Sequence, residues 1–223
     1  MTINPQEVLR DDVEVRTALI SVFDKTGVVE FARELDKRGV NIISTGGTAK
    51  AIRDAGIPVT DVTEVTGFPE ILDGRVKTLH PVIHAGILAN KANPDHMRVL
   101  AEHNITPIDM VVVNLYPFQQ VARKPDVTES QLVENIDVGG PTLLRAAAKN
   151  FGSVAVVSSP EHYERIIGEL DRTGGKLSYE TRWMLMRAAF RVLSTDSTAV
   201  DTRFGLSTVD SDERARKAKS TSK

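Results

Sequence analysis

Short runs of β-branched and aliphatic residues alternate with amphipathic segments along most of the chain. The runs predict strands at 18–24, 40–44, 59–65, 110–115 and 154–158. Apolar positions at helical spacing predict helices at 26–38, 47–55, 95–103, 140–149 and 163–170, with a Gly- and Pro-rich loop before 95–103. This order is typical of an α/β fold, a mostly parallel sheet flanked by helices. The near-continuous apolar run at 110–115 favours a sheet covered on both faces.

The C-terminal third carries a wide apolar surface. Residues 178–200 predict one long helix or a helix pair, with apolar side chains at Trp183, Met184, Leu185, Ala188, Ala189, Phe190 and Leu193. This surface fits packing on the sheet and packing on a second subunit equally well. Residues 211–223 are charged without an apolar anchor, which predicts a disordered tail. We therefore divide the chain into an N-terminal extension (1–16), one domain (17–205) and a tail (206–223).

Composition narrows the class of protein. The 223 residues are 41% hydrophobic and 26% charged, with a formal net charge of -2, which argues against a broad surface for nucleic acid or anionic membrane. No run has the length of a membrane span, and residues 1–16 are unlike a signal peptide. The chain has no cysteine, which excludes disulfides and thiolate chemistry. We expect a cytoplasmic protein.

Two Gly- and Thr-containing loops follow the first two predicted strands. They are the segments 21–27 (SVFDKTG) and 44–48 (STGGT), and each lies where a helix begins. Open α/β sheets bind ligands at this edge, and free N–H groups at a helix start favour an anion. The candidate ligands of a phosphate are Ser21, Lys25, Thr45, Gly46, Gly47 and Thr48. The alternative is that these residues only cap helices and turn the chain.

The segment Gly74–Pro81 (GRVKTLHP) crowds two cations, a hydroxyl and an imidazole between Gly and Pro. The planar guanidinium group of Arg75 is suited to bind an anion. The ammonium group of Lys77 is a point charge that can react when it is desolvated. Thr78 adds a hydroxyl. His80 and His84 lie four residues apart, but no clear third ligand accompanies them, so we expect no metal site.

Two further segments carry candidate chemistry. Asn114 and Tyr116 follow the fourth predicted strand, where an amide and a phenol can face a cleft or the aromatic group can cover the core. Asp137 precedes Gly139 and Gly140, and Lys149 follows twelve residues after Asp137. The two charges can form an acid/base pair only if the Gly-Gly turn folds the helix back. Without further information, a helix cap and a surface lysine explain them as well.

Taken together, five segments in this order resemble one family. They are SVFDKTG, STGGTAK, TGFPEILDGRVKTLHPVIHAGIL, VVNLYPF and IDVGGPTLLRAAAKN. They are similar to the IMP cyclohydrolase domain of the purine-biosynthesis enzyme that usually carries AICAR transformylase as well. The resemblance covers about 17–200. Phe23 departs from the pattern, because relatives often have Ser or Tyr there.

The resemblance implies a methylglyoxal synthase-like fold, a homodimer and a nucleotide substrate, without a cofactor. The implied reaction closes 5-formamidoimidazole-4-carboxamide ribonucleotide (FAICAR) to IMP, and no transformylase activity is expected of these residues. It further implies catalytic roles for Lys77, Asp137, Lys149 and Tyr116. The expected contacts to the substrate come from Ser21, Lys25, Thr45, Gly46, Gly47, Thr48, Arg75, Thr78, Asn114, Gly139 and Gly140. Within this set, Thr78 is expected at the phosphate and Lys77 at the developing oxyanion.

Two other functions stay open at this point. A methylglyoxal synthase would share the phosphate loops but eliminate phosphate from a triose phosphate. A nucleotide-sensing domain of the same fold would bind IMP without catalysis. The clusters around Lys77 and Asp137 favour the cyclohydrolase, because they enclose more than a triose and carry groups for proton transfer.

Overall fold

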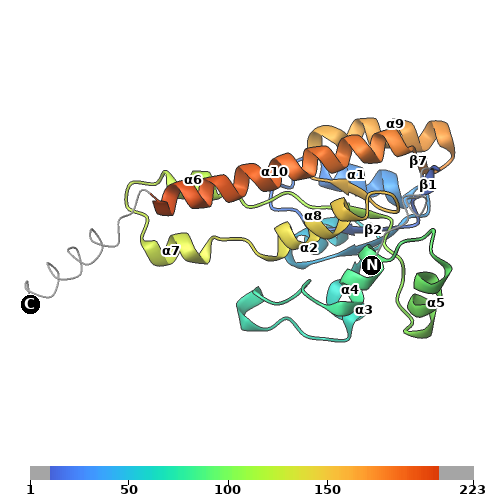
Figure 1. Ribbon diagram of the computed structural model, residues 1–223, viewed down its shortest axis with the longest axis horizontal. Coiled ribbons are helices and arrows are strands. Elements are labelled where there is room, and N and C mark those ends of the chain that lie inside the picture. Colours follow the sequence, from blue (N-terminus) through green and yellow to red (C-terminus); the bar gives the residue numbers. More distant parts are fainter. Residues whose placement is uncertain (1–10, 206–223) are drawn as a thin grey trace, which may run out of the picture.

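Five parallel strands form the central sheet of the computed structural model, which describes residues 11–205 (Figure 1). Their order is β4-β3-β2-β5-β6. The strands are β2 (Thr17–Ile20), β3 (Asn41–Ser44), β4 (Thr60–Asp61), β5 (Met110–Val112) and β6 (Ala155–Val157). All residues of β2, β5 and β6 are buried, as expected for a sheet covered on both faces. The predicted α/β fold is confirmed.

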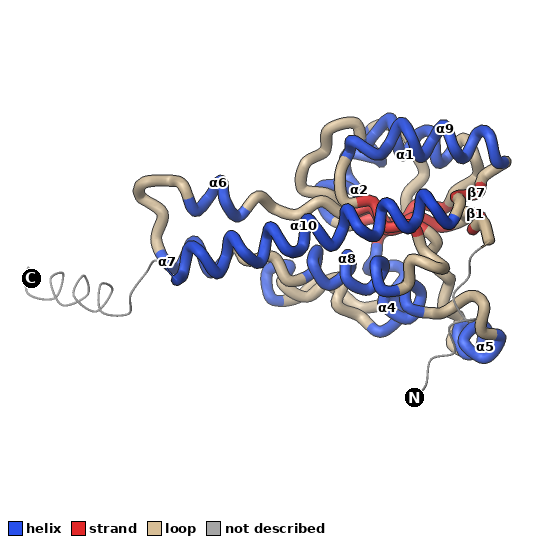
Figure 2. Tube along the Cα trace, turned by 45° about the horizontal axis from the view of Figure 1, so that its top comes forward, coloured by secondary structure: helices blue, strands red, loops and turns tan. Residues whose placement is uncertain are grey.

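The helices flank this sheet or, like α6 and α7, lie beyond its edge (Figure 1). They are α1 (Val28–Asp36), α2 (Gly46–Asp54), α3 (Val62–Thr66), α4 (Pro81–Leu88), α5 (Pro94–Glu102), α6 (Phe118–Ala122), α7 (Glu129–Glu134), α8 (Gly139–Lys149), α9 (Tyr163–Thr173) and α10 (Tyr179–Gly205). In Figure 2, α1 and α9 lie on one side of the strands and α4 and α8 on the other. Helix α10 packs on α8 and β6.

Helix α10 is one continuous helix rather than a pair. Its apolar surface divides between two environments. Leu185, Ala189 and Leu193 are buried in the core, whereas Trp183 and Phe190 are 44% and 41% exposed. Among the described residues, packing on the domain therefore accounts for only part of this surface.

Two predictions of local structure in the segment between α2 and α5 are wrong. The strand predicted at 59–65 is only two residues long and continues as α3. The reason is a capping box, in which Asp61 accepts from the amide of Thr63 and Glu64 reaches back to Asp61. The predicted loop before α5 contains α4, which begins with Pro81 at its first position and His80 as its N-cap.

The segment assigned to the N-terminal extension also contributes structure. Strand β1 (Val13–Glu14) pairs antiparallel with β7 (Lys176–Leu177). Val13 and Val15 are each 5% exposed, so this part of the chain packs on the domain. The first ten residues and the tail predicted at 206–223 lie outside the described residues.

Candidate functional site

The first two βα loops meet at the carboxyl edge of the sheet. Ser21 follows β2, and Thr45 follows β3; their side-chain oxygens lie 2.9 Å apart. Thr45 is the N-cap of α2 but makes no side-chain cap, because its hydroxyl faces Ser21. Gly46 has φ +45, a left-handed conformation that favours glycine. The amides at the start of a helix favour an anion, and Thr45 of this turn lines the cavity described below.

Two lysines converge on this turn. The Cε atom of Lys25 lies 3.7 Å from where a Cβ on Gly47 would stand, and the Nζ atom of Lys77 lies 3.4 Å from the corresponding point on Gly46. The side chain of Lys77 is 16% exposed and forms an ion pair with Glu70. The turn, the two ammonium groups and the hydroxyl of Thr45 together form an electropositive cradle of phosphate size.

The segment that presents Lys77 is locally strained. Leu72, Asp73 and Gly74 have φ of 55, 53 and 87, so two non-glycine residues adopt the left-handed conformation. A bridge between Ile71 and Val76 closes this turn. Such strain is concentrated at functional sites, where the surrounding structure maintains it.

The start of α8 forms the opposite wall. Oδ1 of Asp137 accepts from the amide of Gly140 at 3.0 Å, and a Cβ on Gly140 would overlap Oδ2 of Asp137 and lie 2.8 Å from Leu115. The hydroxyl of Thr78 lies 3.3 Å from the Cβ position of Gly139. Thr78 therefore faces α8, whereas its neighbour Lys77 faces α2.

Between these walls lies a cavity of about 690 Å³, within the size range of small-molecule sites. The predicted residues that line it are Ser21, Thr45, Arg75, Lys77, Thr78, Asn114, Tyr116, Asp137, Gly139 and Gly140. Five segments far apart in sequence thus meet in one place. Arg75 lies at the exposed rim, where it pairs with Glu134 of α7.

An adjoining cavity of about 950 Å³ lies between α6 and α10. It shares Phe23, Asn114 and Tyr116 with the first cavity. The rings of Phe23 and Tyr116 pack edge to face, with centroids 4.4 Å apart. Asp196 of α10 lines the second cavity, and burial, followed by the charge of Asp137, raises the pKa of its carboxyl.

Two predicted substrate contacts have other hydrogen-bond partners. The buried hydroxyl of Thr48 donates to the carbonyl of Val22 at 2.9 Å and accepts from its amide at 3.2 Å. Thr48 is not among the residues that line either cavity. The carboxamide of Asn114 is bonded to the backbone of Phe23 and Asp24. Both side chains hold the loop after β2.

The structure does not bring Lys149 to this site. The Gly-Gly pair begins α8 instead of turning the chain back, so Lys149, nine residues after Gly140, lies roughly 14 Å along the helix at 1.5 Å per residue. Lys149 lines a separate cavity with His84, Arg145 and Phe190. The predicted proximity of Asp137 and Lys149 is therefore wrong within one chain.

Sequence reasoning missed two acidic residues and the contribution of α10. Glu70 lies in the GFPE run next to the predicted cluster, and its charge was the available signal for a partner of Lys77. Glu134 and Asp196 lie in helices without any local motif, and only the tertiary fold places them near the cavities. Residues 11–205 contain no group of three or more acidic or histidine side chains arranged for a metal ion. No helix in that range has the length and apolar character to cross a membrane.

Fold and site together define an α/β domain with a glycine turn and two lysines at the carboxyl edge of its sheet. Residues 27–142 match the family model of the MGS-like domain, and residues 147–222 match that of the AICARFT/IMPCHase bienzyme. The chain belongs to the MGS-like family.

Curated relatives and a solved structure agree with this assignment. The chain is 55% identical over 188 residues to the bifunctional purine biosynthesis protein PurH of Xanthomonas campestris pv. campestris, in strains 8004 and ATCC 33913. The match covers 84% of this chain and 35% of each relative. The crystal structure of ForH is 35% identical, with a TM-score of 0.76, and the match covers 85% of this chain and 99% of ForH.

Proposed function

We propose that this chain is an IMP cyclohydrolase, which converts FAICAR to IMP and water. The observation that carries the proposal is the meeting of Thr45, Lys77, Tyr116 and Asp137 around one cavity, with the Gly46–Gly47 turn next to Lys77. Membership of the family supports the choice of substrate. The cavity also has room beyond the phosphate turn, which favours a nucleotide over a triose phosphate.

The reaction has two steps. The carboxamide nitrogen first attacks the formyl carbon, forming the new C–N bond while a proton reaches the formyl oxygen. The resulting hydroxyl then leaves as water, together with the proton of the former formamide nitrogen. Both reacting groups belong to one molecule, so part of the proximity effect is already present in the substrate. The enzyme must select the ring-closing conformer and move protons.

We assign the phosphate to the turn of α2, with Lys25, Thr45 and the amides of Gly46 and Gly47. An anion there meets free N–H groups and an ammonium group. The base then extends toward α8. This division replaces the expected contact of Thr78 with the phosphate, because the hydroxyl of Thr78 lies beside Gly139.

Lys77 is proposed as the donor to the formyl oxygen. Its ammonium group is largely shielded from solvent and lies between the phosphate turn and the wall formed by α8. A charged donor aimed at an oxygen that gains charge is worth roughly 3 to 4 kcal/mol in a shielded site. Glu70 pairs with this ammonium group.

Asp137 is proposed to orient the carboxamide and accept its proton. Oδ1 is held by the amide of Gly140, which leaves Oδ2 directed to other partners. Tyr116 lies on the same cavity wall as Asn114 and positions the base. Lys149 is left without a role within one chain.

Turnover measurements with purified protein test the proposal. The wild type should convert FAICAR to IMP and should produce no methylglyoxal from dihydroxyacetone phosphate. Lys77→Ala should lower kcat by roughly 100-fold or more, whereas Lys25→Ala should mainly raise KM, because phosphate binding is similar in ground and transition states. Methylglyoxal formation without IMP formation would overturn the assignment. An unchanged kcat in Lys77→Ala would remove Lys77 from the chemistry.

We further propose a cytoplasmic homodimer. The exposed Trp183 and Phe190 on α10 support a partner surface, because large apolar side chains on one helix face favour burial. Analytical ultracentrifugation tests it: the wild type should sediment as a dimer, and Phe190→Asp should shift it toward monomer. A monomeric wild type at micromolar concentration would contradict the proposal.

A further inference from the structure

The side-chain oxygen of Asn114 accepts two hydrogen bonds from backbone amides of another loop. Asn114 follows β5, and its Oδ1 accepts from the amides of Phe23 and Asp24 at 2.7 and 2.9 Å. Its Nδ2 donates to the carbonyl of Asp24 at 2.8 Å. A carboxamide oxygen has two lone pairs, so both acceptor positions are used. The opposite orientation of the amide would place NH2 against two N–H donors, which excludes it.

Other contacts also support this loop: the amide of Ser21 donates to the carbonyl of Val112 at 2.8 Å, and the carbonyl of Lys25 accepts from the amide of Val28 at 3.2 Å. Thr48 exchanges two hydrogen bonds with the backbone of Val22. Beyond Val22 the residues Phe23, Asp24 and Lys25 are exposed. The amides of Phe23 and Asp24 have no backbone partner among the described residues, and Asp24 uses its carboxylate within the loop, for Thr26. The side chain of Asn114 therefore provides the hydrogen bonds that hold the backbone amides of Phe23 and Asp24.

This loop carries groups that matter for the ligand. Lys25 approaches Gly47 at the phosphate turn, and its Nζ also donates to the carbonyl of Phe23 at 3.3 Å. Phe23 packs against Tyr116 at the boundary of the two cavities. If the loop moves, the ammonium group of Lys25 leaves the turn of α2.

We infer that Asn114 is a positioning residue that acts on phosphate binding through the loop 21–25, rather than a side-chain contact to the base. The inference rests on the proposed function for the identity of the ligand. It departs from the direct contact to the substrate that the family resemblance implies for Asn114. The hydrogen bonds of its side chain run to the loop, at the edge of the site that receives the phosphate.

Ribose 5-phosphate separates the two roles because it carries the phosphate and lacks the base. We expect Asn114→Ala to weaken the binding of ribose 5-phosphate and of IMP by the same factor, about tenfold, measured by calorimetry. The KM for FAICAR should rise by a similar factor, with kcat within about threefold of the wild type. An unchanged affinity for ribose 5-phosphate with a weakened affinity for IMP would overturn the inference.

Two variants make the test independent of a general loss of structure. Asn114→Asp keeps two acceptor positions for the amides but replaces the donor to the carbonyl of Asp24 with an oxygen, so it should recover only part of the ribose 5-phosphate affinity. A contact to the base through Nδ2 would not be recovered. Thr48→Val removes a second side-chain support of the loop while preserving shape, and it should weaken ribose 5-phosphate and IMP equally, as Asn114→Ala does. If the wild type and Thr48→Val bound ribose 5-phosphate with equal affinity, the proposed dependence of phosphate binding on the loop 21–25 would be contradicted.

Hydrogen exchange provides a readout that does not depend on the identity of the ligand. In the free protein, Asn114→Ala should accelerate exchange of the Phe23 and Asp24 amides, while amides in the core of α9 keep their wild-type rates. Unchanged exchange at Phe23 and Asp24 would overturn the inference even if the protein bound neither compound. Binding of both compounds without turnover would instead contradict the proposed function and leave this inference standing.

Discussion

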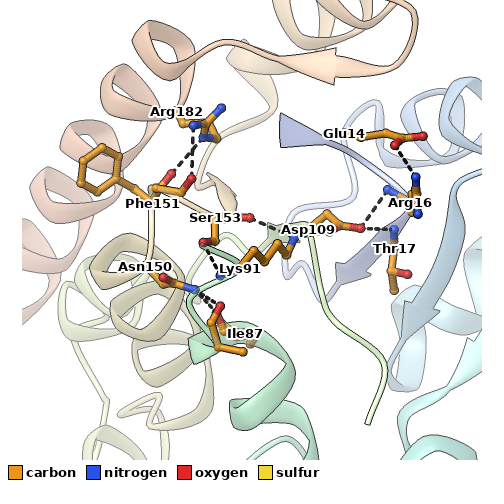
Figure 3. A network of polar contacts seen from close by, with 12 residues as sticks. Glu14, Arg16, Thr17, Ile87, Lys91, Asp109, Asn150, Phe151, Ser153 and Arg182 are labelled. Carbon is orange, nitrogen blue, oxygen red and sulfur yellow. Dashed lines mark hydrogen bonds and ion pairs between the residues drawn. The ribbon is translucent and has the colours of Figure 1, made fainter. Parts of the chain in front are cut away.

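The charged side chains at the two ends of the parallel sheet differ in their exposure and in their hydrogen-bond partners. At the amino end, Asp109 accepts from the amides of Arg16 and Thr17 at 2.8 and 2.7 Å and pairs with Lys91 (Figure 3). Lys91 also donates to the carbonyl of Ser153 at 3.0 Å. At the carboxyl end, Lys25 and Arg75 are exposed, and Arg75 and Lys77 each pair with one acidic residue.

Arg182 extends the network at the amino end. Its guanidinium is 0% exposed and donates to the carbonyls of Phe151, Gly152, Leu177 and Asp11. Burial lowers its pKa. Buried charges that are completely hydrogen-bonded hold neighbouring segments in one arrangement, whereas partly solvated cations are available to a ligand. Charged groups at the amino end therefore maintain the fold, whereas cations at the carboxyl end are available to bind a ligand.

Removing a member of the amino-end network is expected to have the largest effect on stability. Asp109→Ala leaves Lys91 and two backbone amides without their partner in a buried position. We expect a loss of about 3 to 5 kcal/mol in the free energy of unfolding, measured by urea denaturation. KM for the fraction that stays folded should be unchanged. A loss below 1 kcal/mol would show that the network is not the structural element described here.

Gly140→Ala, at the carboxyl end, should affect activity more than stability, in contrast to Asp109→Ala. The added Cβ would overlap the carboxylate of Asp137 and crowd Leu115. A displacement of about 1 Å in a catalytic group can cost 100-fold in rate, so kcat/KM should fall by about that factor, equivalent to about 2.7 kcal/mol.

Gly168→Ala is the matched control for Gly140→Ala. Gly168 is exposed in α9, and its Cβ position has no neighbour within 4 Å. The substitution should stabilise the protein by about 0.5 to 1 kcal/mol without changing kcat/KM. Equal kinetics in Gly140→Ala and Gly168→Ala would contradict the placement of Asp137 in the site.

Alkaline pH tests a buried group in the helical layer between the two ends. Tyr163 stacks on Phe31 with centroids 4.2 Å apart, and burial raises its pKa to about 12. A raised pKa in the folded state gives stability that is complete below pH 10 and is lost as pH rises toward 12. At pH 11 the loss attributable to Tyr163 should be about 1 kcal/mol. Tyr163→Phe should lack this component in urea titrations, and parallel losses in both proteins would contradict the assignment.

The smallest change in the free energy of unfolding is expected for an exposed ion pair. Lys50 and Asp54 pair across one turn of α2, with side chains 73% and 61% exposed. Lys50→Ala should change the free energy of unfolding by less than about 0.5 kcal/mol. A loss above 1 kcal/mol would mean that exposed charge also maintains the fold, and the contrast between the two ends would be weaker.

The sequence predicted the layer structure and most of the cavity, and the failures have local causes. Strands β2, β3, β5 and β6 lie where apolar runs predicted them, because fully buried strands carry a strong pattern. The third strand was overextended because the capping box at Asp61 overrides β-branched neighbours. Helix α4 was missed because His80-Pro81 was interpreted as a turn instead of an N-cap followed by Pro at the first helical position.

The site was predictable where residues follow strand ends and not where tertiary contacts decide. Ser21, Thr45 and Asn114 follow strands of one parallel sheet, so their approach follows from topology. Lys149 lies far from Asp137 because α8 starts at the glycine pair, which spacing alone did not reveal. The bracing roles of Thr48 and Asn114 depend on contacts across 26 and 91 residues, respectively.

A crystal structure with bound IMP tests the central claim most directly, because the proposed chemistry depends on the direction in which the nucleotide lies. The phosphate should contact the amides of Gly46 and Gly47 and the ammonium group of Lys25. The base should lie beside Asp137 and Gly140, with Asn114 still bonded to the loop 21–25. A phosphate bound at Thr78 and Gly139, or a nucleotide seated in the cavity between α6 and α10, would contradict this account.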